Sequence, residues 1–249
     1  MTISIITINR NNADGLARTL QSVALQLQHL PASVSLQHII VDGMSSDNSL
    51  QTVIPELRSH VISLPPAGVY NAINAGIKAA SGDIIGLLHS GDVYEQPDSL
   101  ATIITQFSSQ HNLDYVWGDI RIGRRLYPGN NFSLDALAHG QAPPHPTLYM
   151  RRHVHDVIGL YDESYSVAAD FEYFIRLALN TDLKGLYIPE VIVRMEPGGL
   201  SQSLHNRLVV NNSEKLKALR SHGISSNYFN IFSHYKNVLK GFLCSSTKK

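Results

Sequence analysis

The segment from Ile3 to Ile8 has the sequence Ile-Ser-Ile-Ile-Thr-Ile, and the interpretation of the whole chain starts from it. A short β-branched, mostly apolar run is typical of a strand buried on both faces of a sheet. Apolar residues at helical spacing follow from Leu16 to Leu27, and Asp14 just before them is the expected helix cap. The alternation continues with expected strands at residues 36–41, 61–64 and 83–88 and expected helices at 47–57 and 69–80. This spacing predicts βαβ units and a mainly parallel central sheet flanked by helices.

The second half of the chain is less regular. Residues 127–139 show little periodicity and are expected to form a loop over the site, and Pro189 is expected to interrupt the strands between Leu186 and Met195. Further strands are predicted at 115–122 and 148–150, and helices at 98–107, just after Asp170, and at about 204–221 and 227–243. The last two helices would form a C-terminal helical appendage.

The composition excludes several classes of protein. Lys plus Arg equals Asp plus Glu at 20 each, so nothing favours general nucleic-acid binding. The single cysteine, Cys244, cannot form a disulfide within the chain, which fits a reducing compartment. No apolar run is long enough to span a membrane, and the run at Ile3 is too short and lacks the basic residues of a signal peptide. A cytoplasmic protein is expected.

Polar residues follow several of the predicted strands directly. Asn9 and Arg10 come after the first strand, Asp42 after the second, and residues 65–68 and 89–92 after the third and fourth. In open α/β sheets, ligands bind beyond the carboxyl ends of the strands. We therefore expect these residues to meet at one edge of the sheet.

Five segments in register carry a resemblance to a known family. They are residues 4–11, 40–47, 68–77 and 82–92, and the segment 169–177, Ala-Asp-Phe-Glu-Tyr-Phe-Ile-Arg-Leu. Over roughly residues 2–200 the chain resembles bacterial family 2 glycosyltransferases of the inverting GT-A type, nearest to enzymes of colanic-acid and other surface-polysaccharide synthesis. The resemblance implies a Rossmann-like GT-A catalytic domain at 1–203, with a nucleotide-binding part at about 1–95 and an acceptor part at about 96–203. Residues 204–249 would be the helical extension.

The resemblance implies a nucleotide site at the first strand ends. Asp42 would accept the imide N–H of a uracil ring, with Thr7 and Asn9 beside it; the alternative is that Asp42 and Gly43 only form a turn. The family often has a second acid at Gly43. Further nucleotide contacts are expected from Arg10, Tyr70, Asn71, Asn74, Ser90 and Gly91.

Asp92 resembles the last acid of the family's metal-binding motif, which here reads His-Ser-Gly-Asp from His89. A divalent cation that holds a diphosphate prefers hard oxygen ligands, so Mg²⁺ or Mn²⁺ is the expected cofactor. One carboxylate would hold the ion together with diphosphate oxygens and water. The alternative is an Asx-type turn after the strand.

Asp170 lies where such enzymes place their catalytic base, which takes the proton of the acceptor hydroxyl. Since Asp is also a favoured helix cap, a structural role is the alternative. Glu172 is a second candidate for the base. His145, Glu172 and His205 are candidates for acceptor or diphosphate contact.

Other functions stay open at this point. The missing acid in the metal motif keeps a nucleotide-sugar-binding protein without catalysis as an alternative. A dinucleotide-dependent oxidoreductase is disfavoured because no Gly-x-Gly-x-x-Gly follows the first strand, and a nucleotidyltransferase because no early triphosphate loop is evident.

The expected partners are a nucleotide sugar, probably UDP-linked, and a saccharide or lipid-linked acceptor. Apolar residues recur at helical spacing between Tyr228 and Leu243, with Lys236 and Lys240 elsewhere on the wheel. This helix would either contact the cytoplasmic face of the inner membrane or pack on the catalytic domain or on a second subunit in a homodimer.

Overall fold

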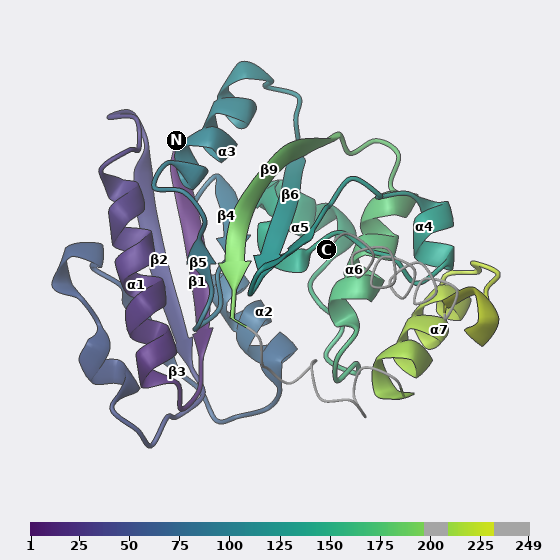
Figure 1. The fold of residues 1–249 in the computed structure, drawn as a ribbon, viewed down its shortest axis with the longest axis horizontal. Helices are drawn as coiled ribbons and strands as arrows, with labels where there is room; N and C mark the ends of the chain where they lie inside the picture. The colour runs from purple at the N-terminus through teal and green to yellow at the C-terminus, as the bar shows by residue number, and fades with distance from the viewer. Residues whose placement is uncertain (197–208, 232–249) are drawn as a thin grey trace, which may run out of the picture.

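The computed structural model describes residues 1–196 and 209–231, which form a curled sheet with helices on both faces (Figure 1). Its nine strands run in the order β3-β2-β1-β4-β8-β6-β9-β5, with β7 paired to β6. Parallel pairing is confined to β3-β2-β1-β4 and to β6-β9, while the remaining pairs are antiparallel. The α/β prediction is confirmed, and the sheet is parallel mainly in its N-terminal half.

The N-terminal half follows the predicted alternation closely. Its elements are β1 (Thr2–Asn9), α1 (Ala13–Leu27), β2 (Ser35–Asp42), β3 (His60–Ser63), α2 (Val69–Ala79) and β4 (Ile84–Leu87). In place of a helix at 47–57 there are two 3₁₀ turns, η1 (Ser49–Thr52) and η2 (Pro55–Leu57). The cap of α1 is Asn12 rather than Asp14, because Asn12 Oδ1 accepts from the Gly15 N–H at 3.2 Å. The β1-β2 register places Asn9 directly beside Asp42.

The C-terminal half contains both predicted elements and some that the sequence did not indicate. It comprises β5 (Val93–Tyr94), α3 (Ser99–Ser109), β6 (Tyr115–Ile122), β7 (Arg125–Tyr127), α4 (Leu134–Ala138), η3 (His145–Thr147), β8 (Tyr149–Arg151), α5 (Arg152–Ile158), α6 (Ala169–Leu179), β9 (Gly185–Met195) and α7 (Asn211–Ser221). The prediction of a loop at 127–139 was wrong in part, because Ser133 caps the short helix α4 through the Ala136 N–H. The helices α5 and α4 are too short for a clear hydrophobic period.

Pro189 does not divide the last strand. β9 runs unbroken from Gly185 to Met195 and pairs parallel with β6. Four steps along β9, from Tyr187 to Val191, face two steps along β6, from Trp117 to Asp119, so the register shifts around the proline. A bulge of this kind removes the need for a ladder hydrogen bond that proline cannot donate.

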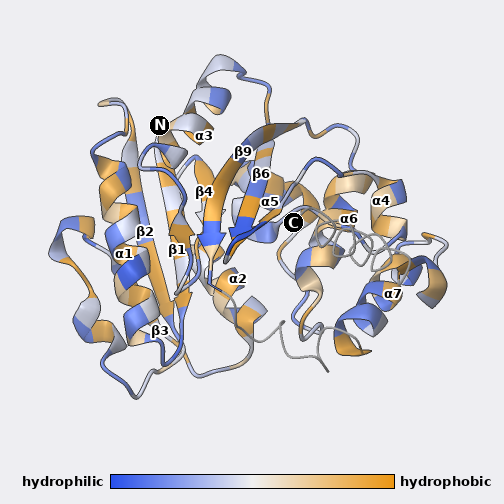
Figure 2. Ribbon diagram, viewed as in Figure 1, coloured by the Kyte–Doolittle hydropathy of each residue, from blue (hydrophilic) through white to orange (hydrophobic). Residues whose placement is uncertain are grey.

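Two hydrophobic clusters lie on opposite faces of the sheet, and strand alternation separates them. On β1, Ile5 faces the cluster under α1 and α3, whereas Ile6 faces the cluster under α2, α6 and α7. Figure 2 shows the central strands mainly in hydrophobic colours and the outer helices in both. Because Leu216 and Leu219 of α7 belong to the second cluster, this helix shares the core of the domain.

The predicted helix 227–243 lies mostly outside the described residues. Residues 228–231 are helical, and Ile231 is buried in the cluster that contains α6 and α7. Within the described residues no helix is long and apolar enough to cross a membrane.

Candidate active site

The ends of β1 and β2 are joined by a network around Asp42. Asn9 Nδ2 donates to Asp42 Oδ1 at 2.8 Å, and the Ser45 hydroxyl donates to the same oxygen at 2.6 Å. The Ser45 N–H donates to Asp42 Oδ2 at 2.8 Å. Asp42 is buried, with both oxygens engaged, whereas the buried Asn9 Oδ1 has no hydrogen-bond partner. A nucleobase that binds Asp42 must therefore displace or share one of these donors.

Thr7 and Arg10 flank this network in different ways. Thr7 is fully buried, and its hydroxyl is hydrogen-bonded to His38 Nε2 at 3.0 Å, so it lies inside the sheet. Arg10 is exposed, and its side chain covers Gly43, where an added Cβ would come within 3.2 Å of Arg10 Cδ. Gly43, at the position of the family's second acid, thus leaves room for the Arg10 side chain at the edge of the sheet.

The loop after β4 is held by Thr19 of α1. The Thr19 hydroxyl is hydrogen-bonded to Asp92 O at 2.8 Å and to the Gly91 N–H at 3.0 Å. Gly91 has φ 104°, a backbone conformation that favours glycine. Ser90 donates to Asn12 O at 3.3 Å, which ties the loop to the start of α1.

Asp92 is buried, and its Oδ2 has no hydrogen-bond partner. Burial raises the pKa of this carboxyl to about 7. A buried, unpartnered carboxylate oxygen is the donor type that Mg²⁺ or Mn²⁺ prefers, and a cation would relieve its desolvation. The described residues contain no group of three or more His, Cys, Asp or Glu side chains that would complete a metal site. The residues therefore fit a metal that is held by Asp92 together with substrate oxygens and water.

Asp170 lies in the first turn of α6 rather than at its cap, which is Ala168. Its Oδ1 accepts from the Phe171 N–H at 2.8 Å and lies 3.4 Å from the Tyr70 hydroxyl. Burial raises the pKa of the Asp170 carboxyl, and the Lys215 ammonium partly opposes this rise. A carboxylate with a raised pKa that keeps one oxygen free of hydrogen bonds to the described residues can accept a proton.

A row of rings connects the two acidic regions. His89 and His145 stack with centroids 6.4 Å apart, and His145 Nε2 is hydrogen-bonded to the Tyr161 hydroxyl at 2.7 Å. Tyr161 in turn stacks on Tyr70 at 6.0 Å. Burial lowers the pKa of both histidines to about 4, so both are neutral at pH 7, and His89 Nδ1 is buried without a partner.

The polar residues of α2 face the loop that leads into α6. The Tyr70 hydroxyl donates to Val167 O at 2.6 Å, and the Asn71 amide donates to Glu163 Oε2 at 3.0 Å. Asn74 donates to Glu163 Oε1 at 2.8 Å and accepts from the Tyr161 N–H at 3.0 Å. The sequence suggested nucleotide contacts for these three residues, and in the structure their side chains hold residues 161–167.

Comparison with known proteins identifies the family. The profile described as "Glycosyl transferase family 2" matches residues 4–153. This chain belongs to glycosyl transferase family 2. The transferase is 36% identical over 186 residues to an uncharacterized glycosyltransferase of Mycobacterium tuberculosis, covering 72% of this chain and 69% of the relative. It is 30% identical over 208 residues to a "PGL/p-HBAD biosynthesis glycosyltransferase" of Mycobacterium bovis, covering 81% of this chain and 79% of the relative.

Solved structures share the GT-A fold of the transferase. TarS 1–349 of S. aureus in complex with UDP-GlcNAc superposes with a TM-score of 0.70 at 19% identity, covering 88% of this chain and 65% of that one. The mannosyltransferase PcManGT of Pyrobaculum calidifontis, in complex with GDP-Man and Mn²⁺, gives a TM-score of 0.65 at 15% identity and covers 86% and 64%. Family and fold confirm the predicted glycosyltransferase and exclude the oxidoreductase alternative.

Glu172 of the transferase is engaged elsewhere. Its carboxylate is buried, receives the Arg176 guanidinium at 2.8 Å and is paired with His222 Nε2 at 2.8 Å. His155 is likewise buried and hydrogen-bonded to the Tyr173 hydroxyl at 2.8 Å. His205, the third candidate for acceptor or diphosphate contact, lies outside the described residues.

Glu172→Gln is expected to lower the free energy of unfolding by about 1–3 kcal/mol, because Arg176 and His222 lose a buried charged partner. Urea unfolding would measure this loss. Turnover per folded molecule should stay within about twofold of the parent, which is well below the loss that removal of a general base causes. A larger fall in turnover would return Glu172 to the catalytic residues.

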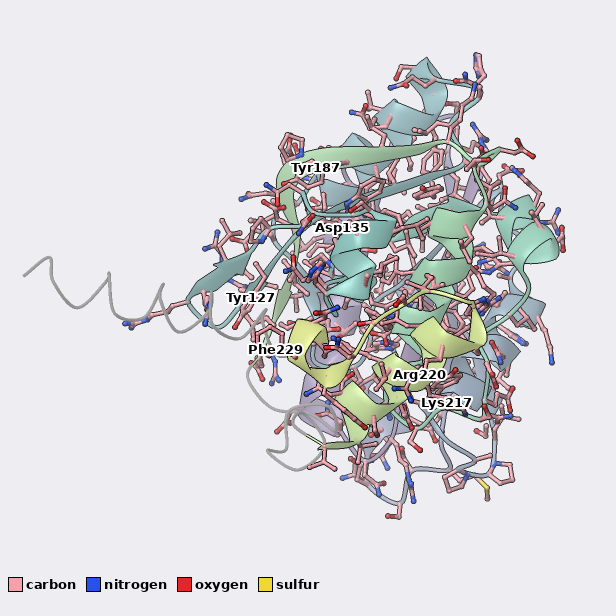
Figure 3. The ribbon with its side chains drawn as sticks, turned by 90° about the vertical axis from the view of Figure 1, so that its right-hand side faces the viewer. Tyr127, Asp135, Tyr187, Lys217, Arg220 and Phe229 are labelled. Atoms are coloured by element: carbon pink, nitrogen blue, oxygen red, sulfur yellow. The ribbon has the colours of Figure 1, made fainter. Side chains whose placement is uncertain are left out.

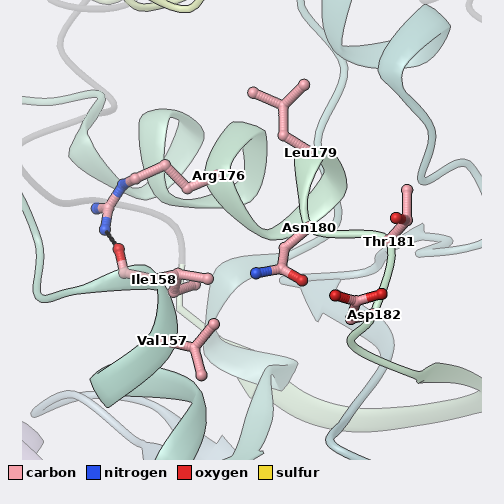
Figure 4. A pocket seen from close by; sticks show the side chains of 7 residues that line it. All are labelled: Val157, Ile158, Arg176, Leu179, Asn180, Thr181 and Asp182. Carbon is pink, nitrogen blue, oxygen red and sulfur yellow. Dashed lines mark hydrogen bonds between the residues drawn. The ribbon is translucent and has the colours of Figure 1, made fainter.

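Two grooves lie apart from most of the site residues. The larger, of about 480 Å³, runs between the ends of α5 and α6 and is lined by Val157, Ile158, Arg176, Leu179, Asn180, Thr181 and Asp182 (Figure 4). The smaller, of about 280 Å³, is lined by Arg18, Gly91, Val93, Gly123, Arg194, Met195 and Glu196. Of the predicted site residues, Gly91 lines the smaller of these two grooves.

The structure also reveals site residues that the sequence did not indicate. Tyr161 and Glu163 hold α2, and Glu214 and Lys215 of α7 contact the start of α6. None of these residues lies in a motif, and each acts across more than 40 positions of sequence. Only the folded chain brings them to Asp170.

Proposed function

We propose that this transferase moves a sugar from a UDP-sugar to a hydroxyl group of a saccharide or lipid-linked acceptor, with inversion, in the synthesis of a surface polysaccharide or glycolipid. The observation that carries the proposal is a pair of acids, the buried Asp92 with an unpartnered oxygen and the half-buried Asp170 with a raised pKa. Two carboxylates in different surroundings suit two different tasks.

Asp170 is the proposed base. Its carboxylate accepts the proton of the acceptor hydroxyl, whose oxygen forms the new bond to the anomeric carbon as the bond to the diphosphate breaks on the opposite face. The Phe171 N–H fixes one carboxylate oxygen, which leaves the other for the acceptor. The row of neutral rings from Tyr70 to His89 adds no positive charge beside the developing oxocarbenium ion.

Asp92 is the proposed protein ligand of Mg²⁺ or Mn²⁺. When bound, the cation would neutralise charge on the departing diphosphate. Asp92 would supply one carboxylate ligand to the cation. The Thr19 hydroxyl holds the loop that carries Asp92 by its hydrogen bond to the Asp92 carbonyl oxygen. Asp42, Asn9 and Arg10 at the neighbouring strand ends are proposed to contact the nucleotide, together with Ser90 and Gly91.

The comparisons support a nucleotide-sugar donor and a divalent cation. TarS was solved with UDP-GlcNAc, and PcManGT with GDP-Man and Mn²⁺. The relative of Mycobacterium bovis is named for PGL/p-HBAD biosynthesis. A cytoplasmic site of action, a membrane contact through residues 227–243 and a homodimer stay predictions.

Asp92→Ala is expected to abolish the metal dependence of UDP binding. In the parent protein UDP should bind more tightly with Mn²⁺ than with a chelator, because the buried Asp92 carboxylate and the diphosphate share the cation. Loss of a charged ligand of this kind costs about 1.5–3 kcal/mol, or roughly 10- to 150-fold in affinity. Titration calorimetry with and without Mn²⁺ measures both proteins.

Asp42→Asn serves as the matched control in that experiment. It should weaken UDP binding equally with and without Mn²⁺, because Asp42 is expected to contact the uracil ring of UDP and not the diphosphate. Metal-independent UDP binding by the parent would contradict the role of Asp92. A hydrolysis screen against UDP-, GDP- and dTDP-sugars would identify the donor, and a preference for another nucleotide would contradict the UDP assignment.

A further inference from the structure

Helix α7 lies far from Asp170 in sequence but contacts the backbone that carries it. Glu214 Oε1 accepts from the Ser166 N–H at 2.8 Å, and Oε2 accepts from the Val167 and Ala168 N–H groups, each at 2.9 Å. These three donors immediately precede α6, whose cap, Ala168, makes no side-chain cap hydrogen bond. A helix start leaves backbone N–H groups without intrahelical partners. Glu214 therefore anchors the turn that leads into α6, because all three donors precede the first helical residue, Ala169.

The next residue of α7 points to the same place. Lys215 Nζ donates to Gly140 O at 2.7 Å and lies 5.0 Å from the centre of the Phe171 ring, which follows Asp170 directly. The two charges act on each other: the ammonium lowers the pKa of the Asp170 carboxyl, and the carboxylate raises that of Lys215. Burial has the larger effect on Lys215 and brings its pKa to about 8.

Apart from Glu214, the other titratable groups that face Asp170 are uncharged at neutral pH. Tyr70 from α2 and Tyr161 from the loop before α6 both have pKa values raised by burial, and His89 from the loop after β4 is neutral. Glu214 is engaged with the three backbone N–H groups. Among the described residues, Lys215 is thus the cation whose field acts on the Asp170 carboxyl.

We propose that α7 is a positioning element of the active site, in which Glu214 fixes the backbone that carries Asp170 and Lys215 holds the Asp170 carboxylate in its charged form. The proposal rests on Asp170 acting as the base. It assigns a task in the reaction to residues beyond the family match, which ends at residue 153. It also places catalytic support within the predicted C-terminal extension.

The sign of the effect follows from the charges. Burial favours the protonated, inactive form of Asp170, and the Lys215 ammonium favours the ionised form. Without the ammonium, Asp170 should become protonated at a higher pH, so the acid side of the pH–activity profile should move upward. Loss of one nearby charge in a partly buried site shifts a pKa by about one unit or more.

Lys215→Met tests this directly, with Lys217→Met as the matched control. Lys217 lies two residues along α7 and is exposed (Figure 3). Its ammonium contacts the Tyr165 ring at 4.3 Å instead of α6. We expect the acid limb of kcat to move up by about one pH unit in Lys215→Met and not in Lys217→Met. UDP affinity should be unchanged in both variants. Lys215→Arg keeps the charge and should restore the parental profile.

A second readout does not require any transferase activity. The carboxyl carbon of Asp170, assigned in the NMR spectrum by its loss in Asp170→Asn, should titrate about one unit higher in Lys215→Met than in the parent. An unchanged titration, or an equal shift in Lys217→Met, would overturn the role of Lys215. A shifted titration in a protein that transfers no sugar would keep the electrostatic pair and contradict the proposed function instead. If Lys215→Met does not fold, Lys215→Gln compared with Lys215→Arg gives the same contrast.

Glu214→Gln separates the backbone role from the charge. One amide oxygen cannot satisfy all three N–H groups, so kcat should fall by about tenfold or more as the start of α6 loosens. The acid limb should keep its parental position, because Lys215 is intact. Unchanged kcat per folded molecule would remove Glu214 from the positioning element.

Discussion

Asp170→Asn is expected to lower the turnover number by about 10²- to 10⁴-fold, the usual contribution of a general base. The amide keeps the shape of the side chain, and its oxygen can still accept the Phe171 N–H, which the carboxylate accepts at 2.8 Å. It cannot take the proton of the acceptor hydroxyl. Steady-state transfer assays with the donor that the hydrolysis screen identifies would measure the effect.

Folding and nucleotide affinity are the controls for this variant. Because the asparagine oxygen can still accept the Phe171 N–H and Glu214 still holds the turn before α6, the melting temperature should change little. UDP affinity should also stay near the parental value. A drop of several degrees in melting temperature with unchanged turnover per folded molecule would show that Asp170 is structural.

Acidification from pH 7 to 5 is expected to destabilise the fold strongly, with His38 contributing about 2 kcal/mol of the loss. His38 is buried between Thr7 and Ser59, and burial lowers its pKa to about 4 from the ordinary 6.5. Between these two values the unfolded chain binds a proton that the folded chain does not. Stability is therefore lost as the pH falls below about 6.5, and the loss levels off below about 4.

Urea unfolding of the parent, His38→Gln and His29→Gln at pH 7 and pH 5 tests this linkage. The glutamine at position 38 can form hydrogen bonds without titrating, so the loss between the two pH values should shrink by about 2 kcal/mol. His29 is exposed, and its replacement should leave the loss unchanged. An equal loss in the parent and His38→Gln would contradict a neutral buried His38. Burial also lowers the pKa values of His89, His145 and His155 to about 4, so part of the acid sensitivity should remain.

The first half of the fold was predictable because its signals are local. The strands from β1 to β4 contain short apolar runs, and α1 and α2 carry a clear helical period. The residues at the ends of β1 and β2 therefore lie side by side, as predicted. Asp42 and Asn9, for example, occupy partner positions in the β1-β2 ladder. The 3₁₀ turns at 49–57 replaced a helix because Pro55 and the left-handed Arg58 at φ 46° interrupt it.

The site was predictable only in part, because several partners come from distant sequence. The nucleotide contacts of Asn71 and Asn74 stay predictions, and the sequence did not indicate that their amides bind Glu163 and the Tyr161 backbone. Glu172 lies two residues from Asp170 on the same helix but turns to Arg176 and His222. A motif gives the position of a side chain along the chain, and the direction it faces depends on which helices pack around it.

The hydrogen bonds between α2 and residues 161–167 have a mechanical consequence. Segments without regular structure usually carry active-site groups because they are free to move. Here Asn74, Tyr70 and Glu214 hold such a segment from two helices, so it behaves as part of the rigid frame. We therefore expect rearrangement on substrate binding to arise in other parts of the chain, with the proposed base kept at a fixed distance from α2.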